Sequence, residues 1–237
     1  MIIVSFGGGY NSTALLIEFS RRGLRPDGIL FADTGGERPE TYAHRTHMNC
    51  WLDSQGWPLI ETPRGPGESL EANCVRRHSL PSLAFGYRTC SQRWKSEPIA
   101  AHIRRQIGTT PYLNVLAFAA DEARRATPYR TTSSQNWYPL VEWDIDRDRC
   151  VALCQEEGFT VSKSACFFCP ATTKPEVIAL AKTHPDLLAR ALAMEAGAQL
   201  DTVRGLGRRW SWRELVERPL FDGLEAGAEM PCVCVDE

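Results

Sequence analysis

The first sixty residues alternate between short apolar runs and segments of helical character. Residues 1–6 form an apolar strand that leads through glycines into a helix, and residues 28–36 form a buried strand with a polar, glycine-containing end. Residues 38–55 have helical character, and residues 57–62 indicate a third strand. This alternation of strand and helix predicts the beginning of a doubly wound sheet with parallel strands.

The same alternation extends to about residue 145, and the rest of the chain is mostly helical. Four elements are expected in the first part, namely helices over residues 68–77 and 96–105 and strands over 112–120 and 138–143. The predicted fold class is α/β, with a doubly wound, mostly parallel five-stranded sheet over residues 1–145. Residues 146–237 are expected to form a helical extension, with helices over residues 146–157, 175–182, 185–199 and 211–217.

The composition favours one core with a small appended lobe. The chain has 237 residues, 43% of them hydrophobic, and a formal net charge of −2. The whole molecule is therefore not attracted to phosphate backbones, and any contact with nucleic acid must rest on local basic patches. The sequence contains no recognisable secretory signal and no apolar run of membrane-spanning length, so a soluble, cytoplasmic protein without a membrane partner is expected.

A run of three glycines separates the first strand from the first helix. Gly7, Gly8 and Gly9 can adopt positive φ without a Cβ penalty, so successive N–H groups can point at an anion. The positive end of the helix points to the same place, and Asn11 or Ser12 can cap it or donate to a phosphate. The spacing matches neither the Walker pattern nor G-x-G-x-x-G. The segment predicts a phosphate cradle, and the alternative is a tight turn whose glycines serve packing.

Two clusters of polar side chains are expected at the carboxyl ends of strands. Asp33 and Thr34 end the second strand, and Asp121, Glu122 and Arg125 follow a later apolar strand. In an open parallel sheet these ends border the ligand crevice, so both clusters should lie beside the glycines. The alternatives are an Asx turn at Asp33 and a solvated, ion-paired turn at Asp121.

Nine cysteines in a chain expected to be cytoplasmic favour metal or redox chemistry over a disulfide framework. Cys166 and Cys169 form a C-x-x-C pair, which suits a metal centre, a redox dithiol or half of a zinc site. Cys154 is expected to be a small buried hydrophobic residue. Cys232 and Cys234, near the end of the sequence, are not assigned a role.

The segment from Val4 to Thr13 resembles the pyrophosphate-loop (PP-loop) signature of the adenine nucleotide α-hydrolase-like superfamily, and most closely the phosphoadenosine phosphosulfate (PAPS) reductase family. Further motifs follow in the family's order to about residue 200: an Asp-Thr-Gly strand end, a Cys-x-x-x-x-Lys loop, an Asp-Glu-x-x-Arg turn and a Cys-x-x-Cys-Pro turn. The chain departs from the family at Gly7, Tyr10 and Asn11, where Ser, Lys and Asp are usual. These departures bear on the placement of magnesium and on turnover.

The resemblance implies a site for ATP with Mg²⁺. The nucleotide-binding residues would be Ser5, Gly7, Gly8, Gly9, Asn11, Ser12, Asp33 and Thr34. Lys95, in the Cys-x-x-x-x-Lys loop, would approach a phosphate or the substrate anion. The expected catalytic group is Lys95 together with Asp121, Glu122 and Arg125.

The resemblance also implies a 4Fe-4S cluster near the nucleotide, with zinc as the less favoured metal. Ser91 stands where the family has the second cysteine of an adjacent pair, so the fourth ligand must come from elsewhere. Cys74 is the first choice for this ligand and Cys150 the reserve. The expected ligands are therefore Cys74, Cys90, Cys166 and Cys169.

Two reactions are typical of such a site. ATP can be cleaved to AMP and pyrophosphate to activate an acceptor, as in the family's tRNA- and DNA-thiolating members, or a sulfonucleotide such as PAPS or APS can be reduced. The carboxyl-terminal Glu-Cys-Gly-His type motif of the reductases has no match here. Activation of a nucleic-acid acceptor, tRNA or DNA, with a sulfur donor therefore ranks first. A non-catalytic nucleotide-binding regulatory module is the third hypothesis, and a homodimer is compatible with all three.

Overall fold

The computed structural model describes residues 1–64, 67–81 and 89–217, which belong to two compact units. Unit 1 contains Met1–Gly67 and Trp94–Ala165, and unit 2 contains the described parts of Glu68–Arg93 and Cys166–Glu237. The division differs from the boundary expected after residue 145. The segment from 146 to 165 belongs with the sheet because its helix packs on the first helix, and the 68–93 excursion belongs with the later helices.

Unit 1 is built on a sheet of five parallel strands, which confirms the predicted fold class. The strand order is β3-β2-β1-β4-β5, and Val4 of β1 lies opposite Ile29 of β2 and Val115 of β4. The chain runs outward from β1 to β3 and then returns to the other side of β1. The carboxyl ends of β1 and β4 therefore form the topological switch point, where open sheets bind their ligands. The strands are β1 Ile2–Ser5, β2 Gly28–Ala32, β3 Leu59–Thr62, β4 Tyr112–Val115 and β5 Ser134–Trp137.

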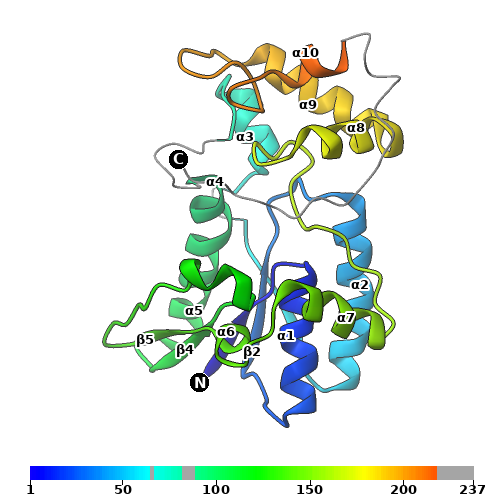
Figure 1. The fold of residues 1–237 in the computed structure, drawn as a ribbon. Coiled ribbons are helices and arrows are strands. Elements are labelled where there is room, and N and C mark those ends of the chain that lie inside the picture. Colours follow the sequence, from blue (N-terminus) through cyan, green and yellow to red (C-terminus); the bar gives the residue numbers. More distant parts are fainter. Residues whose placement is uncertain (65–66, 82–88, 218–237) are drawn as a thin grey trace. The chain divides into compact units, whose positions relative to one another are not determined.

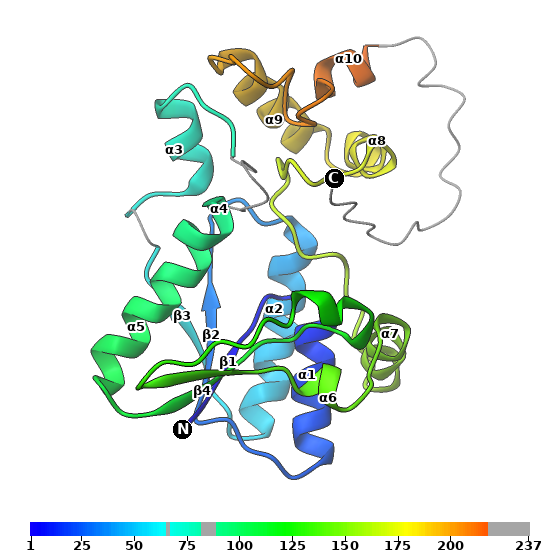
Figure 2. The same cartoon turned by 60° about the vertical axis from the view of Figure 1, so that its left-hand side comes forward.

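Helices cover both faces of this sheet, as Figures 1 and 2 show. On one face α1 (Tyr10–Arg21), α2 (Pro39–Ser54) and α7 (Arg147–Glu156) share a core that includes Val4 and Leu15. On the other face α5 (Glu97–Ile107) packs Ile103 against Ile3 and Leu30. Neighbouring side chains of β1 thus point to opposite layers, as the strand period requires.

The strand predicted over residues 138–143 is wrong. Pro139–Glu142 form the short helix α6, because Pro139 has the fixed φ that suits a first helical turn and no N–H to give to a strand partner. The last strand is instead the polar segment Ser134–Trp137, which pairs with β4. The strand over 112–120 ends early at Val115, and Ala120–Arg125 form a 3₁₀ helix, η3.

Unit 2 is helical in the residues that the structure describes, as expected for the carboxyl-terminal part. Its ion pair between Glu71 and Arg190 joins α3 (Leu70–Arg76) to α9 (Pro185–Gly197). The other helices are α4 Thr89–Ser91, α8 Lys174–Thr183 and α10 Trp212–Val216, and the π-helical turn η2 Gln92–Ser96 leads from unit 2 into α5. Among all described residues, no helix combines the length and apolar character needed to cross a bilayer.

His44 is a buried titratable group of unit 1 and makes its stability depend on pH. The ring lies near Phe6 and Phe159, with Nε2 2.8 Å from Thr13 Oγ1. Burial, and to a lesser extent the charge of His47, lowers the pKa of His44 from 6.5 to about 4. The unfolded chain therefore takes up this proton near pH 6.5 and the folded chain only near pH 4. The contribution to stability is complete above pH 6.5 and is lost as the pH falls to 4.

Urea unfolding at pH 7 and pH 4.5 tests this pH dependence. The wild type should lose roughly 2–3 kcal/mol more of its unfolding free energy than a His44→Phe variant, in which the titrating group is gone. His47→Gln, at an exposed neighbour, is the control and should keep most of the wild-type pH dependence. The same loss in His44→Phe as in the wild type would show that other groups carry it.

Candidate functional site

The glycine run forms a tight loop between β1 and α1. Gly8 has φ +73°, and a Cβ there would lie 3.0 Å from Thr41 Cγ2. Gly9 is the helix N-cap, and Ser12 folds back so that its hydroxyl donates to Gly9 O at 3.0 Å and accepts from Gly9 N at 3.3 Å. The loop therefore requires glycine at position 8, and Ser12, rather than Asn11, closes the first turn of the helix.

Asn11 links the glycine loop to the cluster that follows β4. Its Nδ2 donates to Glu122 Oε2 at 2.9 Å, and Glu122 also pairs with Arg125. Asn11 Oδ1 is buried and has no hydrogen-bond partner among the described residues. Asp121 is exposed and accepts from the backbone N–H of Arg147 at 3.2 Å. The structure thus brings Asn11, Glu122 and Arg125 together, while Asp121 stands at the amino end of α7.

Asp33 is fully engaged by protein donors. Its Oδ1 accepts from Gly35 N and Tyr42 Oη, both at 2.8 Å, and its Oδ2 pairs with Arg64 at 2.6 Å. Burial alone would raise the pKa of Asp33, but the bonds from Arg64, Gly35 and Tyr42 outweigh it, and the pKa is lowered. Thr34 Oγ1 similarly accepts from a backbone N–H two residues on. Both side chains shape the loop after β2, which matches the Asx-turn alternative at Asp33.

Lys95 forms an ion pair with a buried carboxylate, and the sequence pattern did not predict this pair. Its Nζ lies 2.7 Å from Glu37 Oε1, with 30% of the Lys95 side chain exposed and none of the Glu37 side chain. The other oxygen, Glu37 Oε2, is buried without a hydrogen-bond partner in the described residues. Glu37 lies two residues after the Asp-Thr-Gly strand end, and this position is the only sign of its role in the sequence.

A cavity of about 390 Å³ opens at the switch point, on the α5 side of the sheet. It reaches the glycine loop at Gly7 and is bordered by Lys95. Two linked amides lie in its wall, with Asn114 Nδ2 donating to Asn136 Oδ1 at 2.9 Å. The volume falls in the range of small-molecule sites. Its lining residues are Ser5, Phe6, Gly7, Phe31, Ala32, Lys95, Ser96, Ile99, Ala100, Ile103, Tyr112, Asn114, Leu116, Tyr129 and Asn136.

A second cavity, of about 310 Å³, lies at the opposite end of the strands. It is lined by Met1, Pro111 and residues 130–135, at the amino ends of β1, β4 and β5. Ligands of open parallel sheets bind at the carboxyl ends. This cavity is therefore not part of the candidate site.

The segment just before the C-x-x-C pair lies on the glycine loop. Ser164 Oγ donates to Gly7 O, and a Cβ at Gly9 would be 3.4 Å from Ser164 Cβ. Ala165 O accepts from Arg38 N at 3.3 Å. Ser164 thus adds a hydroxyl beside the loop, and nothing in the sequence pattern indicated it because 157 positions separate it from Gly7.

The four cysteines predicted as cluster ligands all belong to unit 2. Cys166 and Cys169 share a turn closed by Cys169 N donating to Cys166 O at 3.0 Å. Burial, and then the neighbouring Cys90, raises the pKa of the Cys74 thiol to about 12. Across residues 1–64, 67–81 and 89–217, however, no three His, Cys, Asp or Glu side chains gather as a metal site requires. The described residues therefore do not form a preassembled cluster site, and the ligand set stays a prediction.

Two other cysteines are core residues of unit 1. Cys150 and Cys154 are completely buried beside the residues of α1, and burial raises the pKa of each thiol to about 12. Cys154 is thus the small buried hydrophobic residue that was expected, and Cys150, the reserve ligand, has the same surroundings. Cys232 and Cys234 lie outside the described residues.

Comparison with known proteins found no matching family model and no matching curated protein. Two solved structures that match are a PAPS reductase from Candida auris and the U34-tRNA thiolase NcsA from Methanococcus maripaludis with its [4Fe-4S] cluster. The first is 19% identical, with a TM-score of 0.43, and the match covers 68% of this chain and 74% of that one. The second is 11% identical, with a TM-score of 0.44, and covers 85% and 73%.

Proposed function

We propose that the glycine loop and the cavity beside α5 form one ATP site, and that this protein cleaves ATP to AMP and pyrophosphate to activate an acceptor. The observation that carries the proposal is the convergence of three features at the switch point of the sheet. These are the loop from Gly7 to Gly9, the amino end of α1 and the cavity bordered by Lys95.

Each feature has a separate task in this site. Backbone N–H groups of the loop and the positive end of α1 hold the phosphates. Lys95, fixed by Glu37, places a positive charge where negative charge develops on the departing pyrophosphate. The amides of Asn114 and Asn136 offer donors and acceptors to the edge of a base. Asp33 holds the neighbouring loop in place.

Magnesium would be held mainly by the phosphates of ATP. The part of the chain that the structure describes contains no group of three carboxylate, cysteine or histidine side chains. Magnesium sites with nucleotides commonly use one or two carboxylates, with phosphates and water completing the octahedron. The bound ion would supply further positive charge on the phosphates. The residues present are compatible with this arrangement.

The proposed reaction has two steps, activation of the acceptor and displacement of AMP. An oxygen of the acceptor attacks the α-phosphorus of ATP, the bond to the bridging α–β oxygen breaks, and pyrophosphate leaves with that electron pair. A sulfide donor then attacks the activated carbon: the carbon–sulfur bond forms, the carbon–oxygen bond breaks, and AMP leaves with the former acceptor oxygen and that electron pair. We propose tRNA or DNA as the acceptor class, in line with the thiolating reaction expected from the sequence motifs.

Product analysis tests this reaction. Protein incubated with α-labelled ATP, Mg²⁺, a sulfide donor and either total tRNA or DNA should yield AMP and pyrophosphate in equal amounts, and the nucleic acid should gain sulfur. Formation of ADP and phosphate would contradict cleavage at the α-phosphorus. Turnover of PAPS to sulfite without ATP would instead favour a sulfonucleotide reductase. Tight ATP binding without products under all conditions would favour a regulatory module.

We also propose that Cys74, Cys90, Cys166 and Cys169 bind a 4Fe-4S cluster when it is supplied, although no reaction step is assigned to it. Protein expressed and purified without oxygen should carry about four iron atoms per chain, the content of such a cluster. Cys166→Ser should lose most of this iron. Cys154→Ser, at a buried core thiol, is the matched control and should keep it. Stoichiometric zinc without iron would contradict the cluster.

A further inference from the structure

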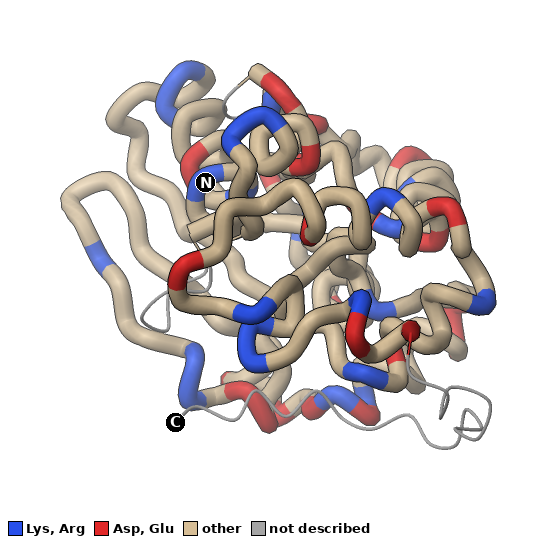
Figure 3. The backbone as a smooth tube through the Cα atoms, turned by 90° about the horizontal axis from the view of Figure 1, so that it is seen from above, with Lys and Arg blue, Asp and Glu red and all other residues tan. Residues whose placement is uncertain are grey.

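An arginine-rich turn in unit 2 is not used by the proposed reaction. Residues 204–213, which follow α9 and run into the first turn of α10, contain four arginines and no acidic residue. Arg204, Arg208 and Arg209 are exposed, and none of the three forms an ion pair with a described residue. Arg213, in contrast, pairs with Glu217. Figure 3 shows that basic and acidic residues are interspersed along most of the chain, so three unpaired arginines in one turn are a local feature.

The backbone of this turn holds the arginines close together. Arg204 N donates to Arg208 O at 2.7 Å, Arg208 N to Gly205 O at 2.9 Å, and Arg209 N to Gly207 O at 2.8 Å. Arg208 itself has φ +62°, which is uncommon for a residue with a Cβ. The hydrogen-bonded turn therefore places the backbone of three arginines on one short segment.

Glu195 of α9 supports the turn from inside. It is 6% exposed and accepts from Leu206 N at 2.6 Å, Trp212 N at 3.0 Å, Arg213 N at 3.1 Å and the Ser211 hydroxyl. A Cβ at Gly205 would lie 2.4 Å from Glu195 Oε2, so only glycine fits there. Three backbone N–H groups and the Ser211 hydroxyl thus donate to the Glu195 carboxylate, which therefore does not pair with the exposed arginines.

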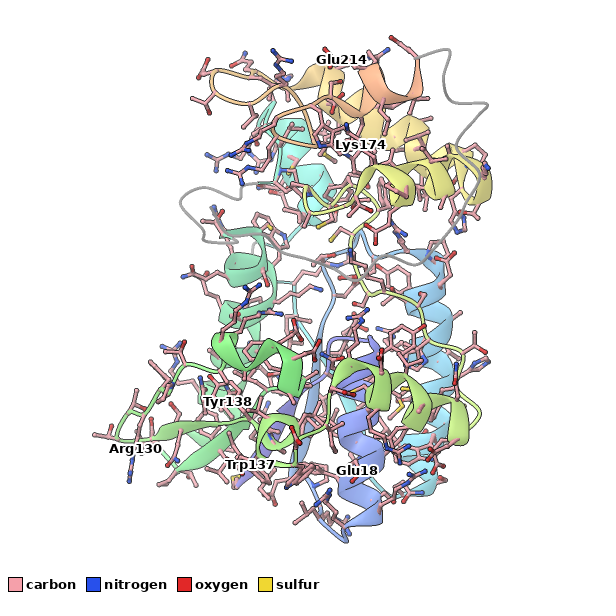
Figure 4. The ribbon with its side chains drawn as sticks, viewed as in Figure 1. Glu18, Arg130, Trp137, Tyr138, Lys174 and Glu214 are labelled. Atoms are coloured by element: carbon pink, nitrogen blue, oxygen red, sulfur yellow. The ribbon has the colours of Figure 1, made fainter. Side chains whose placement is uncertain are left out.

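A fourth cation lies next to the same turn. The Trp210 ring covers Gly207, where a Cβ would be 2.2 Å from Trp210 Cε2. Lys174 Nζ, at the start of α8, lies 5.7 Å from the centre of the Trp210 ring. Lys174 is labelled in Figure 4. Trp210 thereby connects Lys174 to the arginine turn.

We propose that Arg204, Arg208, Arg209 and Lys174 bind the phosphate backbone of a nucleic acid. Guanidinium groups match phosphate oxygens with two parallel hydrogen bonds. A chain with a net charge of −2 has no general attraction to nucleic acid, so binding depends on a local group of unpaired cations. Phosphate contacts orient a nucleic acid without reading its sequence. This inference rests on the proposed function for one point, that the acceptor is a nucleic acid. It adds the surface by which the protein would hold that acceptor.

Fluorescence anisotropy with a labelled RNA hairpin and a single-stranded DNA tests the proposal. The variant carries Arg204→Gln, Arg208→Gln and Arg209→Gln. The matched control carries Arg104→Gln, Arg105→Gln and Arg130→Gln, three exposed arginines of unit 1, of which Arg130 is labelled in Figure 4. In 50 mM salt the first variant should bind at least 10-fold more weakly than the control. Its slope of log affinity against log salt should be smaller by about 2, the value for three lost phosphate contacts on a single strand.

Three outcomes would overturn the inference. The wild type could fail to bind either nucleic acid, the two triple variants could weaken equally, or the turn could bind phosphatidylserine vesicles and not nucleic acid. Affinity for α,β-methylene-ATP is measured on the same samples. If the Arg204/Arg208/Arg209 variant loses nucleic-acid binding but keeps the wild-type affinity for the nucleotide, the result supports the arginine turn as the nucleic-acid site. If the wild type binds nucleic acid but no nucleotide, the result contradicts the proposed ATP site and leaves this surface supported.

Discussion

Replacing Gly8 with valine is expected to lower nucleotide affinity by at least 100-fold. Gly8 has φ +73°, a conformation that a β-branched residue rarely adopts, and its Cβ would meet Thr41 Cγ2 at 3.0 Å. The loop must change its course to accept the side chain. The N–H groups that form the cradle would then no longer point to one place, so calorimetric titration with α,β-methylene-ATP should detect no binding.

Gly23→Val is the matched control for this variant. Gly23 also has positive φ, +66°, but it follows the other end of α1 and a Cβ there has no neighbour within 4 Å. The two variants therefore share the backbone strain and differ in their distance from the proposed cradle. Equal nucleotide affinities in Gly8→Val and in the wild type would place the nucleotide elsewhere.

Lys95→Met is expected to have two separate effects. It leaves the buried carboxylate of Glu37 without its cation, which should lower the free energy of unfolding by roughly 3–5 kcal/mol. It also removes the positive charge beside the cavity, which should reduce the rate of pyrophosphate release by about 100-fold or more. Urea unfolding and a coupled pyrophosphate assay measure the two effects independently.

The double variant Glu37→Gln/Lys95→Met separates stability from catalysis. It removes both charges of the pair, so most of the lost stability should return. Pyrophosphate release should stay low, because Lys95 is still absent. Recovery of the rate together with the stability would show that Lys95 only holds the fold together.

The sheet and the glycine loop could be predicted because their signals are local. A continuous apolar strand before three glycines leaves few alternatives. The helix expected over residues 146–157 is confirmed as α7, with Asp146 as its N-cap and Gly158, at positive φ, just after its end. The last strand could not be predicted in the same way. Ser134–Trp137 is a polar segment at the edge of the sheet, and it becomes a strand only because β4 is beside it.

The sequence predicted which residues lie near the candidate site, but it did not predict which side chains they contact. Asn11 and Glu122 were each expected near the loop, and their hydrogen bond spans 111 positions. The Arg64 and Tyr42 contacts to Asp33, and the pairing of Glu37 with Lys95, likewise follow from the tertiary fold. No motif spacing encodes such contacts, so a carboxylate at a strand end cannot be identified as a ligand or as a loop anchor from sequence alone.

A crystal structure of the protein with α,β-methylene-ATP and Mg²⁺ tests the central claim most directly. The account predicts the polyphosphate against the backbone N–H groups of the loop from Gly7 to Ser12. It also predicts the nucleoside in the cavity between β1, β4 and α5, with Lys95 facing the phosphates. A nucleotide bound at the amino ends of the strands, or bound only by residues of unit 2, would contradict it.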